Sequence, residues 1–96
     1  MDELYEYILY NFGKKNDELS ERIEKIIEKE TSEELKTELS SLLGVSKGYT
    51  EYIAKNIAET TGLTRSKVKS SIKQLIDEGK IETIVENKIT FLIPKI

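Results

Sequence analysis

Residues 62–81 read GLTRSKVKSSIKQLIDEGKI, and this stretch decides the fold of the chain. Its apolar residues recur at helical spacing, which predicts a helix over residues 65–78. Thr64 stands where the N-cap of this helix belongs, and Gly79 stands where the helix ends. The buried face of the helix is expected to carry Val68, Ile72, Leu75 and Ile76.

Two strands are predicted after this helix, because the apolar period changes from 3.6 residues to two. They cover residues 81–85 and 89–93, residues 86–88 join them as a compact hairpin, and Pro94 ends the second strand. Before residue 62, a further helix is predicted to start between residues 50 and 55 and to close at the glycine. Residues 45–52 form the preceding loop, with a short strand around residues 49–53.

Three more helices are predicted in the first half of the chain. The first spans residues 2–12 and is ended by Gly13. Asn16 caps the second, whose apolar face carries Leu19, Ile23, Ile26 and Ile27. A capping box of Thr31 and Glu34 opens the third, which Gly44 ends and whose apolar face carries Leu35, Leu39, Leu42 and Leu43.

The segment from Ile57 to Ile81 follows one pattern without a gap. The pattern consists of an apolar-alanine pair (Ile57-Ala58), a glycine-containing turn (Gly62-Leu63-Thr64), three apolar positions (Val68, Ile72 and Leu75) and a glycine-x-apolar exit (Gly79-Lys80-Ile81). Over residues 33–94 the chain resembles winged helix-turn-helix transcription regulators of the multiple-antibiotic-resistance and related families. The resemblance implies a mainly α fold with a small β-hairpin, a winged helix-turn-helix with two additional N-terminal helices. Residues 33–96 are then the winged domain, and residues 1–32 are an extension that serves dimerisation or caps the core.

The composition excludes several classes of chemistry. The 96 residues include no cysteine and no histidine, so disulfides, thiolate zinc sites and Cys–His or Ser–His nucleophile pairs are ruled out. We therefore expect neither an enzyme nor a metal or cofactor site. The acidic N-terminus does not resemble a signal peptide and no apolar run spans a membrane, which predicts a cytoplasmic protein without a membrane partner. Abundant Glu, Lys and Ile is typical of thermophile proteins, including archaeal or viral ones, and also of AT-rich genomes.

Charge is divided unevenly along the chain. The net charge is −3. Residues 1–48 hold 12 acidic and 7 basic groups, a balance of −5, whereas residues 49–96 hold 6 acidic and 8 basic groups, a balance of +2. Because salt screens charges beyond about 8–10 Å, the second half can bind phosphate although the whole chain is acidic.

The helix over residues 65–78 collects its cations near the N-terminus, where the helix dipole is positive. Each exposed cation there is unfavourable by about 0.3–1 kcal/mol unless an anion such as a phosphate compensates it. One Arg and one Gln suit bidentate base readout, and Ser, Thr and Lys suit phosphate contacts. The expected DNA-binding residues are Thr64, Arg65, Ser66, Lys67, Lys69, Ser70, Lys73, Gln74, Lys80 and Lys88. The alternative is that these lysines only solvate an exposed face.

Four of the seven aromatic residues lie in the first twelve positions. One apolar face suffices for packing, so the remaining tyrosines suit self-association. The expected dimerisation residues are Leu4, Tyr5, Tyr7, Ile8, Tyr10 and Phe12. The alternative is a tyrosine-rich cap over the core of a monomer.

Taken together, these features favour a small transcriptional regulator that binds double-stranded DNA as a homodimer and inserts helix 65–78 into the major groove. The alternative function is a winged-helix protein-interaction module, a small subunit of a replication, transcription or membrane-remodelling complex. The acidic total favours that alternative, and the cations of helix 65–78 favour DNA.

Overall fold

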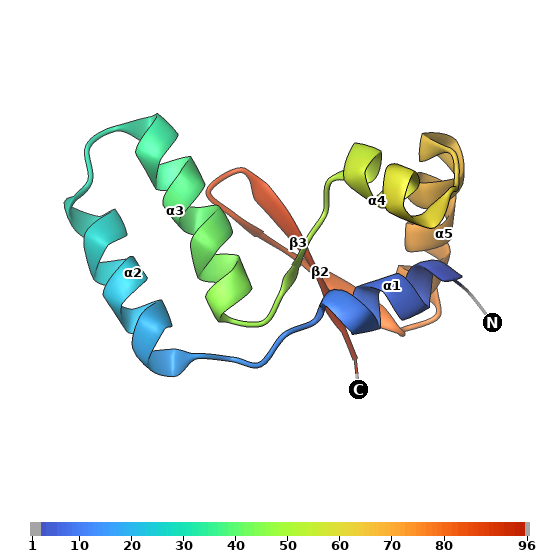
Figure 1. Cartoon of the computed structure of the whole chain (residues 1–96), viewed down its shortest axis with the longest axis horizontal. Helices are drawn as coiled ribbons and strands as arrows, with labels where there is room; N and C mark the ends of the chain where they lie inside the picture. Colours follow the sequence, from blue (N-terminus) through green and yellow to red (C-terminus); the bar gives the residue numbers. More distant parts are fainter. Residues whose placement is uncertain (1–2, 96) are drawn as a thin grey trace.

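The computed structural model describes residues 3–95, so the expected start of the first helix at Asp2 lies outside the described residues. Within that range the chain is mainly helical with a small antiparallel sheet, as the sequence predicts (Figure 1). The elements in chain order are α1 (Glu3–Asn11), α2 (Asp17–Lys29), α3 (Glu33–Ser46), β1 (Thr50–Glu51), α4 (Ala54–Thr61), α5 (Arg65–Asp77), β2 (Ile81–Glu86) and β3 (Ile89–Pro94).

The sheet has the strand order β1-β3-β2, with both pairings antiparallel. The hairpin of β2 and β3 is paired from Ile81 opposite Pro94 to Glu86 opposite Ile89. Its turn therefore consists of two residues rather than the expected three. Asn87 and Lys88 have φ values of 47° and 70°, and positive φ at both positions is characteristic of a type I′ turn, which matches the twist of paired strands.

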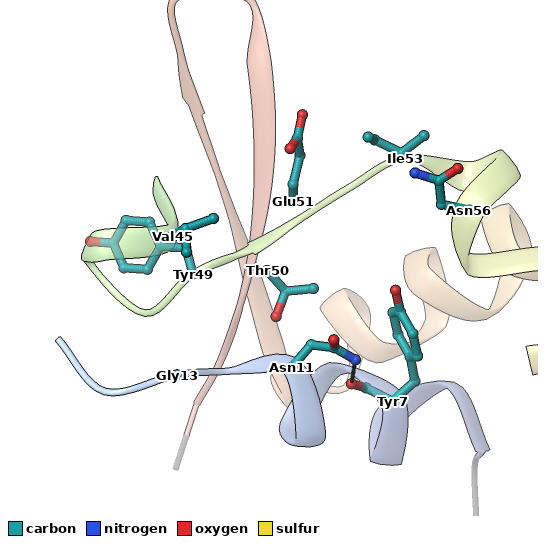
Figure 2. A pocket seen from close by; sticks show the side chains of 9 residues that line it. All are labelled: Tyr7, Asn11, Gly13, Val45, Tyr49, Thr50, Glu51, Ile53 and Asn56. Atoms are coloured by element: carbon teal, nitrogen blue, oxygen red, sulfur yellow. Dashed lines mark hydrogen bonds between the residues drawn. The ribbon is translucent and has the colours of Figure 1, made fainter. Parts of the chain in front are cut away.

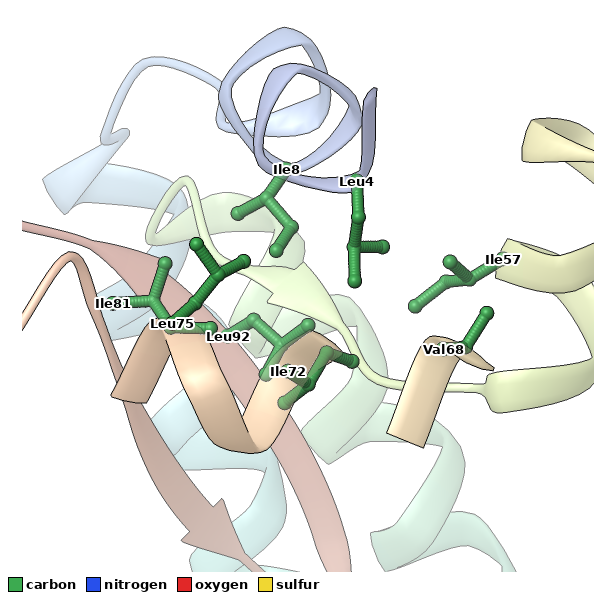
Figure 3. Packing of buried hydrophobic residues seen from close by; sticks show 8 residues of the cluster. All are labelled: Leu4, Ile8, Ile57, Val68, Ile72, Leu75, Ile81 and Leu92. Atoms are coloured by element: carbon green, nitrogen blue, oxygen red, sulfur yellow. The ribbon is translucent and has the colours of Figure 1, made fainter. Parts of the chain in front are cut away.

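The main hydrophobic core lies between the sheet and three helices. Side chains from α1, α4, α5, β2 and β3 converge there (Figure 3), and each is at most 3% exposed. They are Leu4, Ile8, Ile57, Val68, Ile72, Leu75, Ile81 and Leu92. Helix α1 thus contributes to the same core as α4 and α5.

The opposite face of the sheet packs against α3. Leu92 faces the main core, so its neighbour Phe91 points to the other side of β3, where it is fully buried. Its ring lies against Gly44, where an added Cβ would overlap the ring, and its centroid is 6.1 Å from that of Tyr49. Gly44 therefore does not end α3 as expected. The helix continues through it to Ser46 because the missing side chain makes room for the ring.

Helices α2 and α3 form an antiparallel hairpin at one end of the molecule (Figure 1). At its open end the Asn16 amide donates to the Ser46 carbonyl at 2.6 Å, and the buried hydroxyls of Ser20 and Ser46 are 2.8 Å apart. At its closed end Ser32, not Thr31, caps α3 by accepting a bond from the Leu35 amide at 3.4 Å. The boundary expected at residue 32 passes through this hairpin. The structure instead groups α1 with α4 and α5, and α2 with α3.

Several residues expected on buried faces are exposed instead. Each helix of the hairpin buries one side of a wide apolar stripe and leaves the other side exposed. Within residues 3–95, α2 packs mainly against α3 and has no second element over its outer side. Gly13 also has a different role from the expected helix stop. α1 ends at Asn11, and the Gly13 amide donates to the Gly48 carbonyl at 3.1 Å. The residues expected on apolar or buried faces that are exposed are Leu19, Ile26, Leu35, Leu42 and Ile76.

Lys47 connects the hairpin of helices to the hairpin of strands. Its Nζ lies 3.2 Å from a carboxylate oxygen of Glu86 in β2 and 3.5 Å from one of Glu24 in α2. Burial lowers the pKa of Lys47, but the hydrogen bond to Glu86 and the charges of Glu86 and Glu24 outweigh burial and raise the pKa above its ordinary value of 10.5.

Candidate nucleic-acid interface

The turn between α4 and α5 is held by local contacts. Gly62 adopts a left-handed φ of 76° and its amide donates to the Ala58 carbonyl at 2.9 Å, which ends α4. The Thr64 hydroxyl accepts a bond from the Lys67 amide at 3.1 Å, which starts α5. Both helix ends follow from residues inside the turn, so the sequence predicts this part correctly.

Helix α5 presents a polar face to solvent. Its buried side carries Val68, Ser71, Ile72 and Leu75. Ser66, Ser70 and Lys73 follow at spacings of four and three residues along the middle of the opposite side, and all three are exposed. Arg65 and Lys69 lie on one flank of this line, and Lys67 and Gln74 lie on the other, also exposed.

The cations of this face form no ion pair with the other residues that the structure describes. They are Arg65, Lys67, Lys69 and Lys73. The first turn of α5 contains no acidic residue, and the two acids that follow, Asp77 and Glu78, are at the other end of the helix. The result is a strip of positive charge at the end of α5 where the helix dipole is also positive.

Lys80 is separated from that strip. It follows the C-terminal end of α5, so the length of the helix, about 20 Å, lies between Lys80 and Arg65. Its Nζ sits 5.9 Å from the centre of the Tyr5 ring and 3.9 Å from a carboxylate oxygen of Glu78. These contacts join the end of α5 to α1, and Lys80 is only about half exposed.

Lys88 is also separated from the cations of α5. It occupies the tip of the β2–β3 hairpin. The six residues of β2, which begins at Ile81 shortly after α5 ends, separate the tip from that end of the strand by about 20 Å. Figure 1 shows the tip beside α3, at the opposite side of the molecule from α5. Glu86 next to the tip is paired with Lys47. The structure therefore brings together eight of the ten expected DNA-binding residues, those from Thr64 to Gln74.

The residues expected to form a dimer surface on α1 are divided by the fold. Leu4 and Ile8 are fully buried in the chain's own core and do not belong to any surface. Tyr5 packs beside Lys80, and Tyr7 and Phe12 are half-buried. Tyr10 alone among the six is largely outside, with 90% of its surface exposed. A single exposed aromatic residue is common on monomers and does not define an interface.

An open cavity of about 350 Å³ lies between α1, β1 and the start of α4 (Figure 2). Asn11 and Glu51, two of its polar side chains, are already bonded within the chain. The side-chain amide of Asn11 donates to the backbone carbonyl of Tyr7 at 2.8 Å, and the Ser41 hydroxyl donates to the Glu51 carboxylate at 2.7 Å. These bonds show that part of the polar lining contributes to the fold.

Two residues near the interface escape the sequence analysis. Ser71 is buried on α5, where its position one residue before Ile72 is the only sign. Lys55 is exposed in the first turn of α4, which contains no acid and has no side-chain cap. Its signal in the sequence is a cation in the first turn of a helix, the same feature that α5 shows.

When the chain is compared with known proteins, no family model, no curated protein and no solved structure matches it. None of the helices within residues 3–95 has the length and apolar character needed to cross a bilayer.

Proposed function

We propose that this chain is a small DNA-binding regulator that lays α5 in the major groove. The observation that carries the proposal is the group of four cations on α5, Arg65, Lys67, Lys69 and Lys73, which have no anionic partner within residues 3–95. Arg65, Lys67 and Lys69 lie in the first two turns of α5, near the positive end of the helix dipole, where a cation is unfavourable unless an anion compensates it. Phosphates of a duplex would neutralise the cations and accept bonds from the free amides of the first turn.

The proposed fold is a winged helix in which α1 is the first helix of the core. α4 and α5 are then the helix-turn-helix, β2 and β3 are the wing, and β1 pairs with the far strand of the wing. The α2–α3 hairpin is an insertion between α1 and β1. The order of the elements, the strand order β1-β3-β2 and the burial of Leu4 and Ile8 against α4 and α5 support this assignment.

The side chains on α5 suit positioning more than base recognition. Arg65 and Gln74 are the two that can form bidentate bonds to guanine and adenine, and Ser66 and Ser70 can bond to base edges or phosphates. Lysines act mainly through charge. Binding is therefore expected to be dominated by the DNA backbone and to weaken steeply with salt.

The test is fluorescence anisotropy of a labelled duplex, titrated with the protein across a salt series. Four phosphate contacts predict a log–log salt slope of magnitude about 3–4. The double variant Lys69→Glu/Lys73→Glu should bind at least about tenfold more weakly and show a smaller slope. The matched control Lys14→Glu/Lys25→Glu makes the same change in net charge at exposed positions of the loop before α2 and of α2 itself. It should retain binding.

The alternative function, docking of a protein partner on the same fold, predicts a different result. The net charge of −3 favours it, because an acidic protein binds DNA only where its charges are locally reversed. Absence of binding at low salt, or equal loss in the α5 variant and its control, would reject DNA as the ligand of α5 and favour a protein partner.

A further inference from the structure

The α2–α3 hairpin has an apolar face that none of residues 3–95 covers. Leu19 and Ile26 of α2 are 39% and 50% exposed, and Leu35 and Leu42 of α3 are 46% and 50% exposed. Scattered apolar residues are normal on a surface, but these four are spaced seven residues apart on each helix, which places each pair on one line.

The two lines lie on the same side of the hairpin. On each helix the exposed residue comes one position before a residue at least partly buried: Leu19 before Ser20 on α2, and Leu42 before Leu43 on α3. One position corresponds to a rotation of 100° about the helix axis. Because the helices are right-handed and antiparallel, this rotation turns both side chains toward the same side. Gly44 of α3 contacts the sheet through Phe91, so the apolar face is directed away from the sheet.

Opposite charges occupy equivalent places on the two lines. Arg22 lies between Leu19 and Ile26, three residues after one and four before the other. Glu38 lies between Leu35 and Leu42 at the same spacings. The α2 half of the face is therefore basic at its centre and the α3 half is acidic.

We propose that this face binds the same face of a second copy of the chain, with α2 against α3 of the partner, as an antiparallel four-helix bundle. A two-fold axis parallel to the helices brings the basic half of each copy onto the acidic half of the other. The Asn16–Ser46 bond sets the heights of α2 and α3 along the helix axis: six residues from this bond, residue 22 of α2 lies level with residue 40 of α3. A two-fold axis parallel to the helices keeps these heights in the second copy. Arg22 and Glu38 of the second copy therefore differ in height by two residues, about 3 Å. The symmetry makes this pair twice.

The other two-fold arrangement, with α2 against α2, is disfavoured by charge. It would bring the Arg22 side of one copy onto the Arg22 side of the other, with Lys29 adding a further cation on the same line, three residues after Ile26. In the proposed dimer Arg22 either leaves its present partner Glu18 for Glu38 of the second copy or pairs with both. The present Arg22–Glu18 pair is exposed, with 3.0 Å between its nitrogen and oxygen. Such a pair contributes little, so the exchange costs little.

The proposed dimer leaves the nucleic-acid interface open. The hairpin and α5 lie at opposite ends of a molecule 42 Å long (Figure 1), so pairing through the hairpin covers neither copy of α5. The proposal does not depend on DNA binding, and its test contains no DNA.

Sedimentation equilibrium of the full chain over a concentration series into the micromolar range is the test. Wild type is expected to reach twice the 11.0 kDa of one chain. Arg22→Glu and Glu38→Arg should each weaken the dimer at least about tenfold, because each places two like-charged pairs at the interface. The double variant Arg22→Glu/Glu38→Arg restores both pairs with reversed sign and should recover the dimer.

Two further variants complete the design. Lys25→Glu changes the charge as much as Arg22→Glu does, but on the side of α2 that points away from α3, and should not affect the dimer. Leu42→Glu should abolish it, and circular dichroism checks that every variant keeps its helices. A monomeric wild type, single variants that dimerise normally, or a double variant as defective as the singles would each overturn the proposal.

Discussion

At the scale of single residues, Gly44 determines how closely α3 approaches the sheet. It lies inside a helix, where glycine costs about 1 kcal/mol relative to alanine, so helix propensity alone disfavours it. The ring of fully buried Phe91 occupies the place of the missing side chain. A residue that weakens its own helix therefore permits the contact between two layers.

Gly44→Ala is expected to destabilise the protein, although alanine favours the helix. The added Cβ meets the Phe91 ring, and overpacking of this kind costs about 1–3 kcal/mol. Urea unfolding measures the change. In Gly44→Ala/Phe91→Leu the smaller side chain relieves the overlap, so the double variant should lose less than the two single variants together. A Gly44→Ala protein as stable as wild type would contradict the contact.

At the scale of elements, the β2–β3 turn keeps a lysine in a conformation that suits glycine. Lys88 has a φ of 70°, and a left-handed conformation costs a residue with a Cβ about 1–2 kcal/mol. Asn87 before it tolerates the same region better, because its short polar side chain bonds locally. The hairpin thus forms with one favourable and one unfavourable residue in its turn.

Lys88→Gly is therefore expected to stabilise the protein by about 0.5–1 kcal/mol, since it completes the Asn-Gly pair that this turn prefers. Thermal unfolding followed by circular dichroism measures the gain. Lys88→Ala removes the charge but keeps the Cβ, and should show no such gain. Equal stability of the Gly and Ala variants would mean that the turn is not strained.

At the scale of the whole molecule, two groups of helices are held on opposite faces of one sheet. The first group, α1, α4 and α5, packs on the side of Leu92, and α3 packs on the side of Phe91 and carries α2. Lys47 adds an ionic link between the helical hairpin and β2 through Glu24 and Glu86. This arrangement separates the cations of α5 from the apolar face of the hairpin.

Lys47→Met is expected to lower the free energy of unfolding by about 1–2 kcal/mol near neutral pH. The pKa of Lys47 is raised in the folded state, so its stabilisation is fully present below 10.5 and is lost as pH rises through the folded-state value. The difference between wild type and Lys47→Met should therefore shrink at strongly alkaline pH.

Urea unfolding at neutral and strongly alkaline pH measures this difference. Burial also raises the pKa of Tyr52, but that effect is common to both proteins and cancels in the comparison. Lys47→Arg is the control: because an arginine stays charged, its stability advantage over Lys47→Met should not shrink at alkaline pH. A difference that stays constant with pH would show that the ion pairs contribute nothing.

The sequence by itself determined the parts of this protein that depend on neighbours along the chain. The α4–α5 turn, the start and end of α5 and the β2–β3 hairpin follow from Gly62, Thr64, Gly79 and a change of period, because caps and turns bond within a few residues. The eight clustered residues of the candidate interface follow from the same segment.

Only the tertiary structure decided which apolar stripes are covered. Leu4 and Leu42 look alike in the sequence, since both lie on the apolar face of an amphipathic helix. α1 packs against α4 and α5, which buries Leu4. On the outer side of the hairpin no element of the described part of the chain packs, which leaves Leu42 half exposed. Periodicity shows that a helix has an apolar face but not what the face contacts, because burial depends on residues distant in the chain.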